Sequence, residues 1–284
     1  MSEKNKVSFF HKTPSVCPVC EAEFSREELL SGGGRLIAGD LCPELRRHYE
    51  PSVRYGEIWP VIYPVTVCPN CLFAALPGDF DDAADADIAA LQQATEERQH
   101  AAGLLFDDLD YFRPRGLREG MASYLLATMS YDYRAEIISP TFKRGLCSLR
   151  AGWLSSDLER HEPDGNWTYV GELFYRKARF FYSLAMEREE SGEELLQGVS
   201  NFGPDSDQNY SFEGLIYTAS LLEFRFGPRR DAQRRVAALD RAKIRLSKVF
   251  GFGRASRAKP TPILEHARET FAAIDEELEQ LRAS

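Results

Sequence analysis

Two short stretches, Cys17-Pro18-Val19-Cys20 and Cys68-Pro69-Asn70-Cys71, decide how the chain is organised. Each places two thiols two residues apart. Together they supply four soft ligands, the number that a zinc ion takes in a tetrahedral structural site. Proline in the second position presets φ for the tight turn that presents both sulfurs to one ion. Four protein ligands leave no open coordination position, so the spacing predicts structural Zn²⁺ and not a catalytic metal.

Other uses of paired cysteines compete with zinc. A redox-active CxxC usually stands alone beside a βαβ pattern, and two matching CPxC pairs argue against it. A pair of disulfides needs an oxidising compartment. The charged N-terminus Met1–Lys12, however, lacks the apolar core of a signal peptide. His11, His48 or Cys42 could also extend or replace the ligand set, although surface or packing roles are commoner for such residues.

The composition limits the class of protein. The chain has 284 residues, of which 43% are hydrophobic, enough for one large domain or two modest ones. A net charge of −9 disfavours a protein-wide role in binding nucleic acid or an anionic membrane. The uncharged stretch 58–78 has about the length of a membrane span, but its four prolines would interrupt a spanning helix. We therefore expect a cytoplasmic protein without a membrane span.

Three parts of the chain differ in pattern. Residues 1–80 hold the predicted zinc ribbon, in which alternating apolar residues over 63–67 predict a strand that leads to the second cysteine pair. Residues 81–110 are acidic and rich in Ala, Leu and Gln, which predicts a linker helix. Residues 111–284 predict an α-helical repeat-like domain. The expected fold is therefore mainly α, with a small β zinc ribbon followed by an array of helical hairpins.

Apolar residues at helical spacing predict a series of helices in the third part. In chain order they are 116–133, 140–158, 170–190, 207–226, 229–250 and one that begins at Thr261-Pro262. Gly227 is expected to accept a left-handed C-cap conformation, and Pro228 cannot continue the helix. Gly251 and Gly253 are expected to end the next helix. We expect 140–158 to pair with 170–190, and 207–226 with 229–250, as in tetratricopeptide-like arrays.

A basic segment near the C-terminus is the strongest candidate for a binding surface. From Arg225 to Lys259 there are twelve Lys or Arg and two Asp. Four basic residues share one predicted helical face: Arg234, Arg241, Arg245 and Lys248. That face could bind an acidic protein partner or the phosphates of nucleic acid. It could also be a solvated outer face, or one neutralised by the acidic stretch 81–110. The aromatic residues before it are expected in the core and not on a stacking platform: Phe174, Phe180, Phe181 and Tyr182.

The chain resembles a bacterial family of uncharacterised proteins, DUF2225, over most of its length. The resemblance rests on these stretches: Cys17-Pro-Val-Cys20 with Phe24 and Asp40, Tyr63-x-Val-x-Val-Cys68-Pro-Asn-Cys71 with Ala74, Leu149-Arg-Ala-Gly-Trp-Leu154, and Tyr175-Arg-Lys-Ala178. It implies a zinc-ribbon-like head, a tetratricopeptide-like tail and no known activity. The family pattern has glycine after the last cysteine, where this chain has Leu72; glycine would ease a positive φ there.

No catalytic constellation stands out. The five histidines are scattered, and neither HExxH nor a dinucleotide-binding fingerprint is present. The preferred hypothesis is a non-enzymatic adaptor, in which a zinc-folded ribbon supports a helical domain that binds a protein or peptide partner. The alternative is a nucleic-acid-binding regulator that uses the ribbon and the basic face within 225–259. An enzyme with a cryptic site in the helical domain is a third hypothesis.

Overall fold

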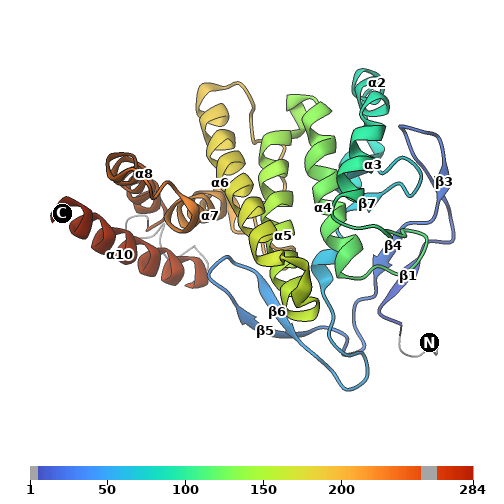
Figure 1. Cartoon of the computed structure of the whole chain (residues 1–284), viewed down its shortest axis with the longest axis horizontal. Coiled ribbons are helices and arrows are strands. Elements are labelled where there is room, and N and C mark those ends of the chain that lie inside the picture. Colours follow the sequence, from blue (N-terminus) through green and yellow to red (C-terminus); the bar gives the residue numbers. More distant parts are fainter. Residues whose placement is uncertain (1–5, 251–260, 284) are drawn as a thin grey trace.

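The computed structural model describes residues 6–250 and 261–283 and confirms the expected fold class, a small N-terminal β region followed by packed helices (Figure 1). Gly251 and Gly253, which are expected to end a helix, lie outside the described residues. Within the described residues, short strands pair as antiparallel two-stranded hairpins. The pairs are β1 (Ser8–Phe10) with β4 (Glu27–Leu29), β2 (Ser15–Val16) with β3 (Glu23–Phe24), β5 (Ile37–Leu41) with β6 (Arg47–Glu50), and β7 (Thr66–Val67) with β8 (Ala74–Ala75).

The helices follow the β region and pack side by side. In chain order they are α1 (Pro77–Asp81), α2 (Asp85–Gln93), α3 (Thr95–Gly103), α4 (Leu117–Ser130), α5 (Pro140–His161), α6 (Trp167–Ser191), α7 (Ser211–Phe226), α8 (Ala232–Phe250) and α10 (Thr261–Ala283). The hairpins α5–α6 and α7–α8 form as predicted, and α10 packs on α8 and α7 (Figure 1). The tetratricopeptide likeness stays a prediction. In the described part of the chain, no helix is both long and apolar enough to cross a bilayer.

The acidic segment contains two helices where one was expected. Helix α2 ends and α3 begins around Ala94, whose φ of −82° and ψ of 9° depart from helical values. Both helices pack on the N-terminal region, and one hydrophobic core runs without a break from Cys17 to Leu278. Because this core does not divide the chain into separate units, the domain boundaries 1–80, 81–110 and 111–284 stay a prediction.

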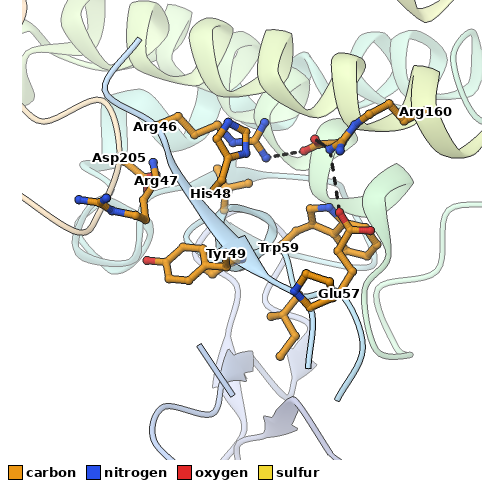
Figure 2. Close-up of a pocket in the computed structure, with 13 residues that line it drawn as sticks. Arg46, Arg47, His48, Tyr49, Glu57, Trp59, Arg160 and Asp205 are labelled. Atoms are coloured by element: carbon orange, nitrogen blue, oxygen red, sulfur yellow. Dashed lines mark hydrogen bonds and ion pairs between the residues drawn. The ribbon is translucent and has the colours of Figure 1, made fainter. Parts of the chain in front are cut away.

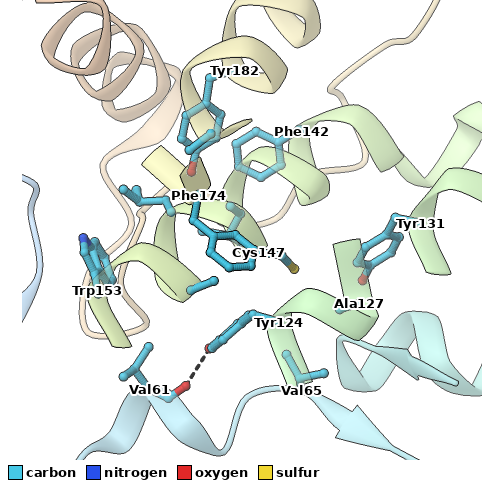
Figure 3. Close-up of a cluster of buried hydrophobic side chains, with 14 of the residues drawn as sticks. Val61, Val65, Tyr124, Ala127, Tyr131, Phe142, Cys147, Trp153, Phe174 and Tyr182 are labelled. Atoms are coloured by element: carbon cyan, nitrogen blue, oxygen red, sulfur yellow. Dashed lines mark hydrogen bonds between the residues drawn. The ribbon is translucent and has the colours of Figure 1, made fainter. Parts of the chain in front are cut away.

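The β region docks on helix α4 through a close contact. A Cβ added to Gly120 would lie 2.5 Å from Ile62, so only glycine lets α4 approach the 3₁₀ turn at Pro60–Ile62 this closely. Nearby, the buried Tyr124 hydroxyl donates a 2.6 Å hydrogen bond to the Val61 carbonyl oxygen (Figure 3). Burial raises the pKa of the Cys147 thiol in this core to about 12, so it behaves as a neutral packing residue.

The turn of the β5–β6 hairpin makes a second contact with the helices, centred on Glu44. Its carboxylate accepts hydrogen bonds from Trp153 Nε1 (2.7 Å) and the Tyr175 hydroxyl (3.2 Å). It also forms a 2.5 Å ion pair with Arg225 on α7. Together these contacts join the hairpin to α5, α6 and α7. Two turns between the cysteine pairs, the β5–β6 turn and Pro60–Ile62, are thus packed against the helices.

Two local predictions are wrong. Only Thr66 and Val67 of the expected strand over 63–67 pair with another strand. Pro64 has no N–H to donate, so pairing starts only after it. Gly227 is extended, with φ −70° and ψ 176°, and not left-handed. Glycine is needed there for space, because a Cβ would lie 2.3 Å from the Glu223 carbonyl oxygen.

Candidate metal centre and arginine groove

The two CPxC turns have the same backbone geometry, which we call the knuckles. In the first, the Cys17 N–H donates to the Ala22 carbonyl at 3.0 Å and the Glu21 N–H donates to the Cys17 carbonyl at 2.9 Å. The second repeats both bonds, at 2.9 and 3.0 Å, within residues 68–73. Hairpin β2–β3 carries one knuckle and β7–β8 the other. Each turn therefore aims its two sulfurs in the same way.

Both knuckles need a positive φ after their second cysteine. Glu21 has φ 60° and Leu72 has φ 56°. The glycine that the family pattern has in place of Leu72 would adopt this positive φ without strain. A left-handed conformation costs a residue with a Cβ about 1–2 kcal/mol. Leu72 lies against the hydrophobic core, and this packing offsets part of that cost.

The four predicted cysteines come together, although the two pairs lie far apart in the chain. The Sγ atoms of Cys17 and Cys71 are 3.7 Å apart, those of Cys20 and Cys68 are 3.6 Å apart, and all four lie within 4.8 Å of one another. A disulfide would require about 2.05 Å, and all the cysteines are free. Four sulfurs around one ion at about 2.3 Å lie about 3.8 Å apart in a tetrahedron. The cluster therefore fits a metal ion and not two disulfides.

The electrostatics of the cluster favour a bound cation. Hydrogen bonds from Cys17 and Cys71 lower the pKa of the Cys68 thiol to about 2. The contact with Cys68 raises the pKa of the Cys17 thiol to about 12, and contact with Cys17 and Cys68 raises the pKa of Cys71. The Cys68 thiol thus ionises easily, whereas ionisation of the Cys17 and Cys71 thiols is disfavoured. A cation at the centre would lower the pKa of each thiol by stabilising its thiolate.

Helices α2 and α3 hold one knuckle each. The Gln92 side chain on α2 donates a 2.7 Å hydrogen bond to the Val19 carbonyl in the first knuckle. The Gln99 side chain on α3 donates at 3.3 Å to the Asn70 carbonyl in the second. The Asn70 amide in turn lies 3.4 Å from Cys20 Sγ, so it links the two knuckles. The relative placement of the sulfurs is fixed from outside the ligand set.

Arg98 on α3 is a supporting residue that the sequence did not reveal. Its side chain is fully buried and donates to the Leu91 carbonyl at 2.8 Å and the Cys71 carbonyl at 3.3 Å. Burial lowers the pKa of Arg98, and the Cys71 and Cys17 thiols oppose that shift. With a metal bound, a buried guanidinium this close to Cys71 would offset part of the negative charge of the thiolates.

The residues considered as alternative ligands lie elsewhere, as the commoner surface or packing roles require. His11 Nε2 is 2.9 Å from a Glu28 carboxylate oxygen, His48 lies on β6, and the Cys42 N–H donates to the Arg46 carbonyl. Within residues 6–250 and 261–283, the four cysteines form the one group of Cys, His, Asp or Glu side chains placed to share an ion.

A groove of about 800 Å³ lies between α6, α7 and α8. We call it the arginine groove because its lining includes Arg176, Arg179, Arg225, Arg229, Arg230, Arg234 and Arg241. Three carboxylates also line it: Glu172, Glu223 and Asp231. Five of these arginines form ion pairs within the chain: Arg176 with Glu172, Arg179 with Glu223, Arg225 with Glu44, Arg229 with Glu277 and Arg234 with Asp231. The lining arginines still outnumber the lining carboxylates by seven to three, in a chain whose net charge is −9. No lysine is among these residues, and arginine is the side chain suited to bidentate binding of carboxylates.

The predicted basic face forms one wall of this groove and its continuation. Arg234 and Arg241 line the groove, and Arg245 and Lys248 lie one and two turns further along α8. Arg234 pairs with Asp231 at 3.4 Å. In the part of the chain that the structure describes, no ion pair neutralises Arg241, Arg245 or Lys248. Their charges are thus open to an outside partner.

The acidic stretch 81–110 does not neutralise this face within the described residues. Its carboxylates pair elsewhere: Asp81 with Arg26, Asp87 with Arg134 at 3.0 Å and Asp108 with Arg118 at 3.3 Å. The basic segment finds its partners partly in α10, where Glu277 pairs with Arg235 at 2.7 Å.

The aromatic residues on α6 do not all join the core. Phe174, Phe181 and Tyr182 are buried as predicted. Phe180 is 54% exposed, so the prediction for that side chain is wrong. It lies one turn beyond Arg176 on α6 and is not itself a lining residue of the groove.

A second cavity, of about 330 Å³, lies beside Trp59 (Figure 2). Its lining comes from β6, the segment around Trp59, the end of α5 and Asp205. The buried Asp157 carboxylate pairs with both Arg46 and Arg160, and burial with the nearby Arg46 lowers the pKa of His48. The lining holds as many carboxylates as arginines and no Ser, Thr, Cys or Lys nucleophile. Its lining has no excess of arginines over carboxylates, and this sets it apart from the arginine groove.

Two cysteine knuckles in a small β region, followed by paired helices, define the class as a four-cysteine protein with a helical array. The family model described as "Uncharacterized protein conserved in bacteria (DUF2225)" matches residues 10–274. The chain belongs to this DUF2225 family. A relative from Borreliella burgdorferi, described as "Uncharacterized protein", is 37% identical over 277 residues, covering 98% of this chain and 99% of its own. No solved structure matches the chain.

Proposed function

We propose that the protein is a non-enzymatic adaptor that holds a segment of a protein partner in the arginine groove. The observation that supports this proposal is the gathering of seven arginines in one groove of an acidic chain, of which Arg230 and Arg241 have no ion pair within the described residues. Three of the residues on or continuing that wall, Arg241, Arg245 and Lys248, have no internal ion pair within the described residues. A cationic concave surface of this kind attracts and orients an acidic partner.

Zinc is the metal proposed for the four cysteines. Soft thiolates in a closed tetrahedral set suit Zn²⁺, which needs no further ligand in a structural site. When bound, zinc supplies the positive charge that keeps the thiols ionised and joins two knuckles about fifty residues apart. The free cysteines also fit a reducing compartment, and we propose a cytoplasmic location.

A protein segment fits the groove better than nucleic acid. Glu172, Glu223 and Asp231 pair with Arg176, Arg179 and Arg234, so these three arginines are less available to a continuous run of phosphates. A peptide with a few carboxylates needs only the cations that have no internal ion pair. The aromatic residue of the lining, Phe226, is stacked on Tyr175 with centroids 4.6 Å apart, so one face of its ring is already covered. A nucleic-acid-binding regulator remains the second candidate, because three cations of the basic face lack internal ion pairs.

A pull-down from cell extract, with and without nuclease, tests the adaptor. The double variant Arg234→Glu with Arg241→Glu reverses two exposed groove charges. Lys12→Glu with Arg268→Glu is the matched control, since both residues are exposed, lie outside the groove and change the net charge equally. We expect partners that survive nuclease, bind the wild type and the control, and are lost from the groove variant. Partners that persist on the groove variant would overturn the proposal, and partners lost with nuclease would favour nucleic acid.

A further inference from the structure

Helix α6 carries large exposed apolar side chains next to the arginine groove. Tyr169 is 56% exposed, Leu173 43% and Phe180 54%. With Arg176 they lie at positions i, i+4, i+7 and i+11, which is one stripe of a helix. Because Arg176 lines the groove, this α6 stripe runs along the groove's edge. Apolar side chains gathered beside a charged groove are typical of interaction surfaces.

The basic face on α8, the wall opposite α6, indicates how long the occupant of the groove must be. From Arg234 to Lys248 the basic face spans about 21 Å of α8, or about four helical turns. Charges recur along it every three to seven residues, at 234, 241, 245 and 248. An occupant that pairs with this face needs carboxylates at a similar helical spacing.

We propose that the occupant is an acidic amphipathic helix, with carboxylates on one face and apolar side chains on the other. This inference rests on the proposed function. The guanidiniums of Arg230, Arg241 and Arg245, which have no ion pair within the described residues, pair with the acidic face through bidentate contacts, and the α6 stripe covers the apolar face. Apolar burial supplies affinity that salt does not weaken, while the charges fix orientation and speed the encounter. A purely polyanionic partner would leave the α6 stripe exposed.

Fluorescence anisotropy with three labelled probes tests the occupant on the full-length, zinc-loaded protein. The first probe is a helical peptide with glutamates on one face and leucines on the other. The second has serine in place of each leucine, and the third is a single-stranded oligonucleotide of equal charge. We expect the leucine peptide to bind about tenfold more tightly than the serine peptide, and both more tightly than the oligonucleotide.

Two double variants test the apolar contacts and the charged contacts separately. Leu173→Ser with Phe180→Ser should reduce the leucine peptide to the affinity of the serine peptide and leave the serine peptide unchanged. Leu104→Ser with Phe112→Ser is the matched control, since these side chains are exposed but lie outside the groove. Arg234→Glu with Arg241→Glu should abolish binding of both peptides.

The outcomes separate this inference from the adaptor proposal. Equal affinity for the two peptides, no binding of either, or no effect of the stripe variant would overturn the amphipathic occupant. Partners that still depend on the groove arginines in cell extract would then leave the adaptor proposal standing. Tighter binding of the oligonucleotide would overturn both.

Discussion

Replacing Arg98 with methionine tests whether the metal centre depends on its buried surroundings. The substitution keeps much of the side-chain length but removes the charge and the donors to Leu91 and Cys71. A hydrogen bond from a charged group contributes about 1.5–3 kcal/mol. The bond to Cys71 is long, at 3.3 Å, so it belongs at the low end. Relief from burying a charge offsets part of the loss. We therefore expect a net loss of about 3 kcal/mol in the free energy of unfolding.

The same substitution should weaken metal binding separately. Arg98 fixes the carbonyl of a ligand residue and places positive charge beside the thiolates. Loss of such outer contacts typically lowers metal affinity 10–100-fold, which corresponds to about 1.4–2.8 kcal/mol. Competition with a chromophoric zinc chelator measures the affinity, and urea unfolding of the zinc-loaded protein measures stability. Arg118→Met is the control, because Arg118 pairs with exposed carboxylates away from the cysteines.

Unchanged zinc affinity in Arg98→Met would refute the coupling between this guanidinium and the metal centre. Lower stability with unchanged zinc affinity would show that Arg98 stabilises the packing of α3 without affecting the metal centre. Equal effects in the Arg118 control would attribute the result to overall charge.

Three further predictions concern separate features. Cys68→Ser should lose bound zinc and stability together, measured as metal content per chain and urea midpoint; a folded, equally stable, metal-free variant would end the structural-metal hypothesis. Gly120→Ala should lower the free energy of unfolding by about 1–3 kcal/mol, because the new Cβ would overlap Ile62, and unchanged stability would show that α4 can shift without cost. The pKa of His48 is lowered by burial and Arg46, so its neutral form is favoured in the folded state. Its contribution to stability is present above the unfolded pKa of about 6.5 and is lost as the pH falls toward the folded pKa. His48→Gln should therefore flatten the decline of the urea midpoint below neutral pH, and an identical pH profile would contradict the assignment.

The candidate metal site was predictable because the spacing within each cysteine pair is local. Two cysteines two residues apart report the geometry of a single turn, and the positive φ expected after the last cysteine was found at Leu72. Arg98 could not be found in this way. Its role depends on a fold that brings position 98 beside position 71, and a lone arginine in an acidic stretch looks like a surface residue.

Half of the arginine groove was predictable for a similar reason. Helical periodicity placed Arg234, Arg241, Arg245 and Lys248 on one face, and the structure places the first two in the groove. The facing wall, with Arg176 and Arg179, comes from a helix that periodicity assigns only by its buried side. Gly227 shows the limit in detail: the helix end was predicted at the right residue, but the backbone conformation was set by crowding against Glu223.

Glu44 lies within the chain segment that the two cysteine pairs enclose, and it reaches the helices at Arg225, a residue of the arginine groove. A metal ion that joins Cys20 to Cys68, 48 positions apart, closes that segment into a loop. Closing a loop of this length removes about 4 kcal/mol of chain entropy from its open ensemble. Thermodynamic linkage then requires reciprocity: if metal loading orders Glu44 and so changes partner affinity by some factor, partner binding must change metal affinity by the same factor. The affinity for the proposed partner would then depend on how much metal is available. Titrating each ligand in the presence of the other would measure that factor.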